Sequence, residues 1–473
     1  MRALDARAIG LAVVAAALFA GCGGGGGSSA PTVPGHFGPT PTPTPTPAPT
    51  STPQQAACPS APQPCHIVII MEENRSFDNM FAGYPGADAP MQGLDHNNKV
   101  VPLQPWPLEG SGNLGHERPN FTTEYNNGNM NGFDLEEVIG NNPQTFPYSY
   151  VPRSESAIYW KLAQNYTLAD HMFQSNSSSS FAAHQFIISA QSADVVGAPD
   201  LPPWGCDAPP GTTTTIGVAP PATPAPGPFP CFPWDKPSYN TLADLLDAAK
   251  DSWRYYTPSN IEGGDLWSAY DAVRHIRCET PSCKSPTAEW LTNVVSPETT
   301  ILQDIPAGRL ASVSWVVPSW PNSDHPDSLS NTGPDWVASI VNAVGQSKYW
   351  NSTAIFIMWD DWGGWYDDVP PPQLDDVGLG FRTPFLVVSP YAKHNYVSHV
   401  QYEYGSVVKF AESTFGLPSL YALDSRATDA RANALSDCFD FTQQPQPFKT
   451  LAAKHTRSFF LTQPPSRHPP DEN

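Results

Sequence analysis

The chain has 473 residues, with 24 Lys and Arg against 45 Asp and Glu, which gives a formal net charge of −21. This length allows one large α/β domain or two smaller domains, and a hydrophobic content of 40% argues against a disordered chain. The acidic balance disfavours nucleic-acid binding and adsorption to anionic lipid headgroups, because both surfaces would repel the chain. A local pocket could still bind phosphate.

The N-terminus predicts export. A basic start precedes an apolar run from Ile9 to Ala20, which is too short to span a bilayer and is typical of a secretory signal peptide. Small residues before Cys22 resemble a bacterial lipoprotein box, with Phe19 where leucine is usual. We expect a signal peptide over 1–21, followed by lipidation of Cys22; the alternative is an ordinary signal peptide that a cysteine happens to follow. The protein would then be secreted or periplasmic, or anchored to the outer membrane.

Composition divides the rest of the chain. Glycines and serines and then a Pro-Thr run fill 22–57, which predicts a linker that cannot form a core. The folded body is expected over 58–450 and a C-terminal tail over 451–473. Residues 199–238 hold 13 prolines and are expected to form a surface insertion.

The cysteines favour disulfides, since an exported protein meets an oxidising compartment. Pairing of sequence neighbours is the simplest arrangement, although sequence cannot prove connectivity. The spacing contains no pair of CxxC motifs, which disfavours a zinc site made of thiolates. The expected pairs are Cys58 with Cys65, Cys206 with Cys231 and Cys278 with Cys283, and Cys438 has no partner in this arrangement.

The folded body alternates short apolar runs with amphipathic stretches, which predicts an α/β fold with a mostly parallel central sheet flanked by helices. The apolar runs are continuous and rich in β-branched residues, as in strands that are buried on both faces. Thr241 is a plausible N-cap that pairs with Asp244. Strands are expected at His66–Met71, Ser312–Val317, Ala354–Trp359 and Phe385–Val388, and helices at Thr241–Ala249 and Asp335–Tyr349.

Acidic or imidazole groups follow three of these strands. Glu73 and Asn74 come after the first strand, Asp324 and His325 follow the second, and Asp360 with Asp361 ends the third. Ligands in open α/β sheets bind outside the carboxyl ends of the strands, so a shared site is expected there. Clustered acidic groups need a cation, and these oxygen ligands suit a divalent metal ion such as zinc or calcium. The structural alternatives are a strand-end turn for Asp360-Asp361, a loop cap for Glu73-Asn74 and a hydrogen-bonded histidine for His325.

A serine run supplies a candidate nucleophile. Ser175 to Ser180, with only Asn176 interrupting the serines, leads into a predicted helix that begins near Phe181. A hydroxyl at a helix N-terminus lies where backbone N–H groups favour an anion, and a neighbouring metal would activate it. The alternative is a polar cap, and composition alone cannot say which serine reacts.

These motifs together resemble the bacterial phosphoesterase family of phospholipases C and acid phosphatases. The resemblance runs from Cys65 to Phe448 and depends on four segments. They are Glu73-Asn74-Arg75-Ser76-Phe77-Asp78, Phe173-Gln174-Ser175 with Ser180 to Gln185, Asp324-His325-Pro326 and Trp359-Asp360-Asp361-Trp362-Gly363-Gly364-Trp365-Tyr366.

The resemblance implies an alkaline-phosphatase-like fold and a metal-assisted serine or threonine nucleophile. It implies that Ser180 is the nucleophile and also touches the metal, and that His116 and His325 contact the phosphoryl group or its leaving oxygen. The implied metal ligands are Glu73, Asn74, Ser180, Asp360 and Asp361.

The segment around Ser180 departs from the phospholipase branch. That branch has Gly-Pro-Thr and then Asn-Arg, whereas this chain reads Ser178-Ser179-Ser180 and then Ala183-His184, which resembles a branch with Ala-His-Gln. An acid-phosphatase-like activity on a phosphate ester is therefore expected, with phospholipase C as the alternative. His184 either lines the pocket or packs under the helix, and Asp368 stands where a histidine often occurs.

Other classes fit less well. A sulfatase motif, a Gly-x-Ser-x-Gly elbow and an HExxH motif are missing from the sequence. The non-enzymatic alternative is a surface lipoprotein that only binds a ligand, which would not need both a nucleophile and metal ligands. Sequence does not determine the metal, the substrate class or the oligomeric state.

Overall fold

The computed structural model describes residues 63–136, 138–217, 225–227, 231–233, 239–259, 266–280, 283–466 and 468. The predicted signal peptide, the lipidation of Cys22, the linker over 22–57 and Cys58 lie outside these residues. Within them, no helix is both long enough and apolar enough to cross a membrane.

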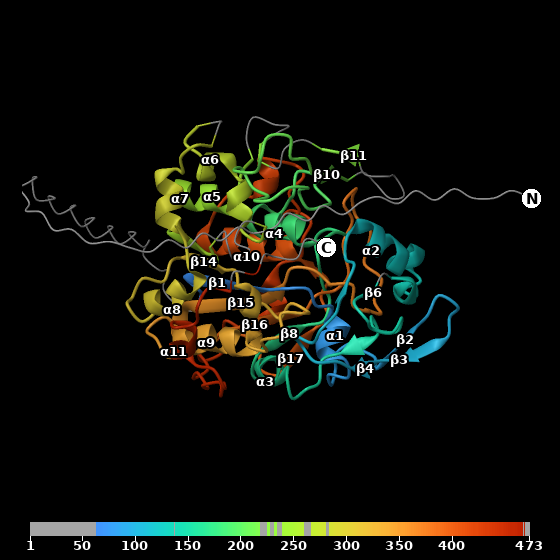
Figure 1. The fold of residues 1–473 in the computed structure, drawn as a ribbon. Coiled ribbons are helices and arrows are strands. Elements are labelled where there is room, and N and C mark those ends of the chain that lie inside the picture. The colour runs from blue at the N-terminus through green and yellow to red at the C-terminus, as the bar shows by residue number, and fades with distance from the viewer. Residues whose placement is uncertain are drawn as a thin grey trace, which may run out of the picture. The chain divides into compact units, whose positions relative to one another are not determined.

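A sheet of eight strands forms the centre of the fold, and most of its strand pairs are parallel (Figure 1). The strand β1 (His66–Glu72) lies between β14 (Val313–Val316) and β15 (Thr353–Trp359), and both pairings are parallel. Every residue of these three strands is buried, as their continuous apolar runs predict. The remaining strands are β12 (Trp253–Tyr256) and β13 (Val294–Val295) beyond β14, and β16 (Phe385–Val388), β8 (Thr167–Ala169) and β17 (Tyr396–Ser398) beyond β15.

The strand β16 is the exception to the parallel order. It pairs antiparallel with β15 on one side and with β8 on the other. The strands β8 and β17 therefore run in the same direction as β1 and β15, and their carboxyl ends reach the same edge of the sheet. The predicted fold class, a mostly parallel sheet flanked by helices, is confirmed.

Helices cover both faces of the sheet (Figure 1). One layer holds α4 (Ser180–Ser189), α5 (Leu242–Ala249) and α10 (Tyr404–Phe415), which contact one another. The other layer holds α3 (Ala157–Asn165), α8 (Ile301–Asp304), α9 (Gly333–Gly345) and α11 (Arg457–Phe460). The further helices are α1 (Phe77–Phe81), α2 (Arg118–Tyr125), α6 (Arg274–Arg277) and α7 (Ala288–Asn293).

Short two-stranded sheets complete the described strands. They pair β2 (Gln92–Leu94) with β3 (Val100–Pro102), β4 (Gln104–Pro105) with β7 (Ser149–Tyr150), β5 (Asn113–Leu114) with β6 (Val138–Ile139), β10 (Thr215–Ile216) with β11 (Ala225–Pro226), and β9 (Met172–Phe173) with β18 (Tyr402–Glu403).

The helices predicted at Thr241–Ala249 and Asp335–Tyr349 are present with small changes at their ends. Thr241 is the N-cap of α5, and Asp244 accepts hydrogen bonds from its backbone N–H and its hydroxyl. The helix α9 begins at Gly333 rather than Asp335, because Pro334 fits the first turn, and it ends at Gly345 rather than Tyr349. Beyond 450, Leu451 and Phe460 are buried and α11 contacts α9, so this part of the predicted tail packs onto the folded body.

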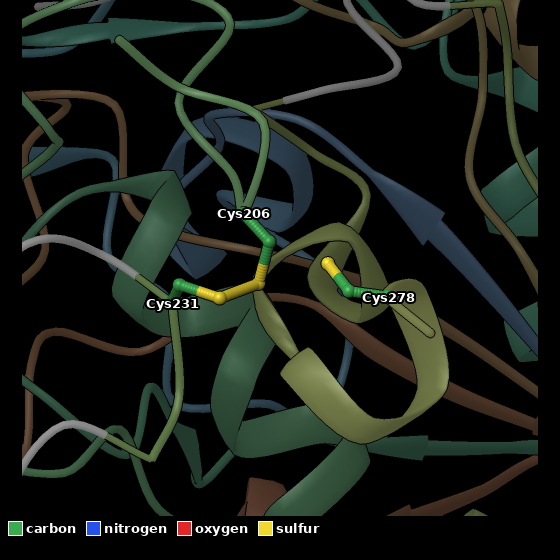
Figure 2. A group of neighbouring side chains, drawn as sticks. All are labelled: Cys206, Cys231 and Cys278. Carbon is green, nitrogen blue, oxygen red and sulfur yellow. A yellow bond between two sulfur atoms is a disulfide. The ribbon is translucent and has the colours of Figure 1, made fainter. Parts of the chain in front are cut away.

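Two of the predicted disulfides are present, Cys206–Cys231 and Cys278–Cys283. Figure 2 shows the sulfur of Cys278 beside the Cys206–Cys231 bridge. These sulfurs lie close enough together to resemble a metal-binding group, but they are used in disulfide bonds. Cys65 is also disulfide-bonded, and Cys438 is a free, buried cysteine as expected.

Candidate active site

The loops after β14, β1 and β15 meet at one edge of the sheet, as the sequence predicts. Backbone hydrogen bonds hold them in register: Glu73 N–H donates to the carbonyl of Ser323 at 2.8 Å, and Arg75 N–H donates to the carbonyl of Asp361 at 2.9 Å. Neighbouring parallel strands end at the same edge, so residues far apart in sequence become neighbours in space.

An oxygen-rich group lies at this junction. Glu73, Asn74, Asp360 and Asp361 are fully buried. Glu73 Oε2, Asn74 Oδ1 and Asp360 Oδ2 have no hydrogen-bond partner among the described residues. Buried carboxylate oxygens without hydrogen-bond partners are costly unless a cation neutralises them, so this donor set could hold a divalent metal ion.

Like charges crowd this group. Burial raises the pKa of Glu73 well above its usual range, and the neighbouring Asp360 raises it further. Burial and Asp360 also raise the pKa of Asp361. Without a cation, burial and mutual repulsion therefore disfavour the ionised forms of Glu73 and Asp361.

The backbone conformation at Asn74 explains why asparagine stands in the first motif and why glycine stands at 363 in the Trp359–Tyr366 motif. Asn74 has a left-handed φ of 61°, which asparagine tolerates well, and its N–H donates to Asp360 Oδ1 at 2.9 Å. Gly363 also has a positive φ, of 60°, and a Cβ there would lie 2.4 Å from the carbonyl oxygen of Asn74. The close approach of these loops therefore needs glycine at 363.

Ser180 faces the carboxylates from the first position of α4. Ser179 occupies the N-cap position with an extended backbone. The Ser180 hydroxyl donates to Asp361 Oδ2 at 3.2 Å, and the residue Ser180 is 4% exposed. The structure therefore joins Ser180 to the group formed by the two strand-end motifs.

The preceding serines have other partners. The Ser177 hydroxyl donates to the carbonyl of Val377 at 2.8 Å. Ser178 donates to the carbonyl of Val196, and Ser179 donates to Glu117 Oε1 at 2.8 Å. Sequence reasoning missed Glu117, although the resemblance implied a role for its neighbour His116.

His184 faces the carboxylates and does not merely pack beneath its helix. One turn after Ser180, its Nε2 lies 3.2 Å from Glu73 Oε1 and 3.7 Å from Asp360 Oδ2. Possible ligand atoms of these three residues all lie within 4.8 Å of one another. Burial lowers the pKa of His184 to about 4, so the ring is neutral at pH 7.

The two predicted phosphoryl-contacting histidines lie in different surroundings. His116 is buried, and its Nε2 lies 2.9 Å from Nδ2 of Asn74 and 3.9 Å from Asp361 Oδ2. His325 is buried in the loop after β14, where its Nδ1 lies 2.6 Å from the carbonyl of Pro326 and its ring packs against Trp320. Contact of either residue with a phosphoryl group stays a prediction.

Other residues of the Glu73–Asp78 motif hold the loops after β14 and β15 in place. The Arg75 side chain donates to the carbonyl of Asp324 through Nη2 at 2.7 Å and lies over the ring of Trp365. The Ser76 hydroxyl accepts from Asn79 N–H at the start of α1 and donates to the carbonyl of Tyr366 at 2.6 Å. These contacts connect the motif to both neighbouring loops.

Arg382 also connects separate segments around the site, and sequence reasoning missed it. Its fully buried guanidinium pairs with Asp78, Asp367 and Asp368 at 3.3, 2.8 and 2.7 Å. Asp368, which stands where a histidine often occurs, is therefore part of a buried ion-pair network. No local sequence pattern could have indicated this role of Arg382, because Arg382 lies far along the chain from its partner Asp78.

Residues 65–418 match the Phosphoesterase family. The chain belongs to this family. The match confirms the resemblance and covers most of the extent expected from Cys65 to Phe448.

Phospholipases C are among the similar proteins. "Phospholipase C B" of Mycobacterium tuberculosis is 24% identical and aligns over 81% of this chain and 79% of its own length. "Non-hemolytic phospholipase C" of Burkholderia pseudomallei is 26% identical over 74% of this chain and 55% of its own. A solved protein of the alkaline phosphatase superfamily from Vibrio parahaemolyticus aligns over 78% of this chain and 69% of its own, at 11% identity and a TM-score of 0.32.

Family membership gives the reaction class. This phosphoesterase is a hydrolase that acts on phosphoric ester bonds. The non-enzymatic alternative, a surface lipoprotein that only binds a ligand, loses its support.

Proposed function

We propose that this phosphoesterase is an exported, metal-dependent enzyme that hydrolyses phosphate esters through Ser180. The observation that carries the proposal is the contact of the Ser180 hydroxyl with Asp361 Oδ2. Beside it lie oxygens of Glu73, Asn74 and Asp360 that have no hydrogen-bond partner among the described residues. A nucleophile and a cation-binding group would be needed side by side for phosphoryl transfer.

Glu73, Asn74, Asp360, Asp361 and Ser180 would hold the metal ion. When bound, such an ion supplies positive charge that lowers the pKa of a neighbouring hydroxyl and stabilises the charge that develops on the phosphoryl oxygens. Zinc, calcium and other divalent ions all remain candidates.

The chain's own groups then carry out two displacements. Oγ of Ser180 attacks phosphorus while Asp361 Oδ2, the acceptor of its hydrogen bond, takes the hydroxyl proton. The ester P–O bond breaks, and the leaving oxygen takes a proton from water, with His116 or His325 as the proposed contact to that oxygen. Water then attacks phosphorus, releases phosphate and restores the Ser180 hydroxyl.

The preferred substrate is a phosphomonoester, as in the acid-phosphatase-like branch. The segment Ala183-His184 supports this choice, because an imidazole facing Glu73 and Asp360 occupies the place where the phospholipase branch has arginine. Phospholipase C activity is the second candidate, and the similarity to named phospholipases C favours it.

A paired assay separates the two activities. Purified protein would be given p-nitrophenyl phosphate and, separately, phosphatidylcholine vesicles, with metal analysis of the same sample. Release of inorganic phosphate from the monoester supports the first proposal. Release of phosphorylcholine and diacylglycerol, with a negligible rate on the monoester, would replace it with the second.

Export is proposed from the signal peptide over 1–21 and the linker that follows it. The Cys206–Cys231 and Cys278–Cys283 disulfides support an oxidising compartment. If Cys22 is lipidated, wild-type protein partitions with membranes, and Cys22→Ala releases active protein into the soluble fraction. Soluble wild-type protein with an unmodified Cys22 contradicts the anchor.

A further inference from the structure

A second group of metal-ligand side chains lies near the other end of the same sheet edge. Asp170 follows β8, and His399 follows β17, which pairs with β8 in parallel register. His171 is the next residue in the chain after Asp170. The strands thus bring two imidazoles and one carboxylate together from segments far apart in sequence.

The ligand atoms of this group converge. His171 Nδ1 lies 2.8 Å from Asp170 Oδ1, and His399 Nδ1 lies 2.8 Å from Asp170 Oδ2. The three possible ligand atoms all lie within 4.8 Å of one another. Both rings therefore present Nδ1 to the same carboxylate, whose Oδ2 also accepts from the N–H of Asp88 at 2.9 Å, and one ion could contact all three side chains.

The backbone holds the three residues in place. Asp170 N–H donates to the carbonyl of Ser398 at 3.1 Å, and Tyr402 N–H donates to the carbonyl of His171 at 2.8 Å. Nη1 of Arg382 donates to the carbonyl of Asp170 at 2.9 Å. Ligands fixed at strand ends in this way lose little freedom when an ion binds.

Solvent can reach this group. The Asp170 side chain is buried, but the side chains of His171 and His399 are 24% and 60% exposed. An aqueous ion can therefore enter, and water can complete its coordination. The group around Glu73 and Asp360 differs, because it is fully buried.

We propose that Asp170, His171 and His399 form a second metal site, open to solvent, for a divalent transition ion of the Zn²⁺ class. Two imidazole nitrogens and a carboxylate oxygen suit zinc, whereas calcium and magnesium favour oxygen ligands. On binding, each ring would coordinate the ion through Nδ1 and carry a proton on Nε2, so contacts to the ion would replace the present Nδ1–carboxylate contacts. The bound ion links the ends of β8 and β17, and so stabilises the folded chain.

The other candidate groups do not compete with this one. The carboxylates of Asp78, Asp367 and Asp368 surround the guanidinium of Arg382, a cation that already pairs with all three. The cysteines at 206, 231 and 278 are in disulfides.

The test counts bound zinc in the full folded protein. Chelator-stripped wild type, His399→Ala and His171→Ala would be titrated with Zn²⁺, and retained metal would be measured by elemental mass spectrometry. We expect each variant to bind Zn²⁺ at this site more than about 100-fold more weakly, because losing a direct ligand costs more than losing an outer-shell partner. His394→Ala, an exposed histidine before β17, is the matched control and should bind like the wild type.

Two further measurements keep the outcomes distinct. Asp360→Asn should lose the metal ion bound near Glu73 and keep the ion bound at Asp170. The double variant with Asp360→Asn and His399→Ala should therefore lose both ions. In the wild type, Zn²⁺ should shift the imidazole NMR signals that His171→Ala and His399→Gln remove. Equal zinc affinity and stoichiometry in wild type and a folded His399 variant, with unchanged imidazole signals, would show a hydrogen-bonded cluster only and overturn the proposal.

Discussion

Nδ2 of Asn74 lies 2.9 Å from Nε2 of His116, and this contact fixes the direction of the Asn74 amide. Nδ1 of His116 lies 2.9 Å from the carbonyl oxygen of Leu114, which can only accept, so Nδ1 carries the proton and Nε2 accepts from the amide. The amide oxygen of Asn74 then points away from His116, and it has no hydrogen-bond partner in the part of the chain that the structure describes.

This relationship predicts that His116 affects metal binding. In His116→Ala, Nδ2 of Asn74 loses its acceptor and the amide can turn, so we expect metal affinity to fall about 10- to 100-fold. Isothermal titration with a divalent ion measures the change. If His116 acts only on the phosphoryl group, kcat falls while metal affinity stays at the wild-type value.

Ser180→Ala should lower kcat by at least about 100-fold, the lower range for loss of a central catalytic group. Ser177→Ala is the matched control, because its hydroxyl contacts the carbonyl of Val377 and not the carboxylates. Acid quench during turnover should trap phosphate on the peptide that contains Ser180. Phosphate on another serine would move the nucleophile, and none under burst conditions would favour direct attack by water.

Asp361→Asn should weaken metal binding, because it removes a charged oxygen from a fully buried group. Chelation of the wild type should abolish activity, and a divalent ion should restore it. Asp440→Asn, a loop carboxylate that contacts Thr442, should leave both properties unchanged. Full activity of wild-type protein shown to be metal-free would rule out the metal-dependent mechanism.

Gly363→Ala should destabilise the fold and lower activity together. Its new Cβ would lie 2.4 Å from the carbonyl oxygen of Asn74, in addition to the cost of a positive φ. Gly416→Ala is the control, since it has a positive φ of 66° but no atom within 4 Å of its Cβ. We expect about 1–2 kcal/mol for Gly416→Ala and about 1–3 kcal/mol more for Gly363→Ala in denaturant unfolding. Equal costs would mean that the loops do not approach closely.

Glu412 should make stability depend on pH. Burial raises the pKa of this carboxyl to about 8, and nearby Asp429 adds to the effect. The folded state therefore keeps a proton that the unfolded state releases above a pH of about 4.3, so this contribution to stability falls as pH rises toward 8. Glu412→Gln mimics the protonated form, and its stability relative to the wild type should increase between pH 5 and pH 8. A constant difference across this range would contradict the shift.

Several features of the fold follow from local sequence. His66–Met71 and Ala354–Trp359 are continuous apolar runs, and such runs have one favourable place, inside a sheet covered on both faces. The acidic residues that follow them must then come to the carboxyl edge of that sheet. The capping pair of Thr241 and Asp244 could likewise be predicted, because both residues belong to one helical turn.

The direction of β16 could not be predicted in this way. Phe385–Val388 looks like the parallel strands, because burial on both faces demands the same apolar side chains in either direction. Arg382 was missed for a related reason, since its partner Asp78 is brought to it only by packing.

The sequence by itself determined the family resemblance, the strand-and-helix alternation and the residue types at the strand ends, because these depend on neighbours along the chain. Only the tertiary structure decided that Ser180, rather than Ser177 or Ser179, contacts Asp361, and that His184 faces Glu73. Adjacent serines have the same chemistry, so their difference arises from the turn into α4. That turn points each hydroxyl toward a different partner, and those partners are supplied by distant segments of the chain.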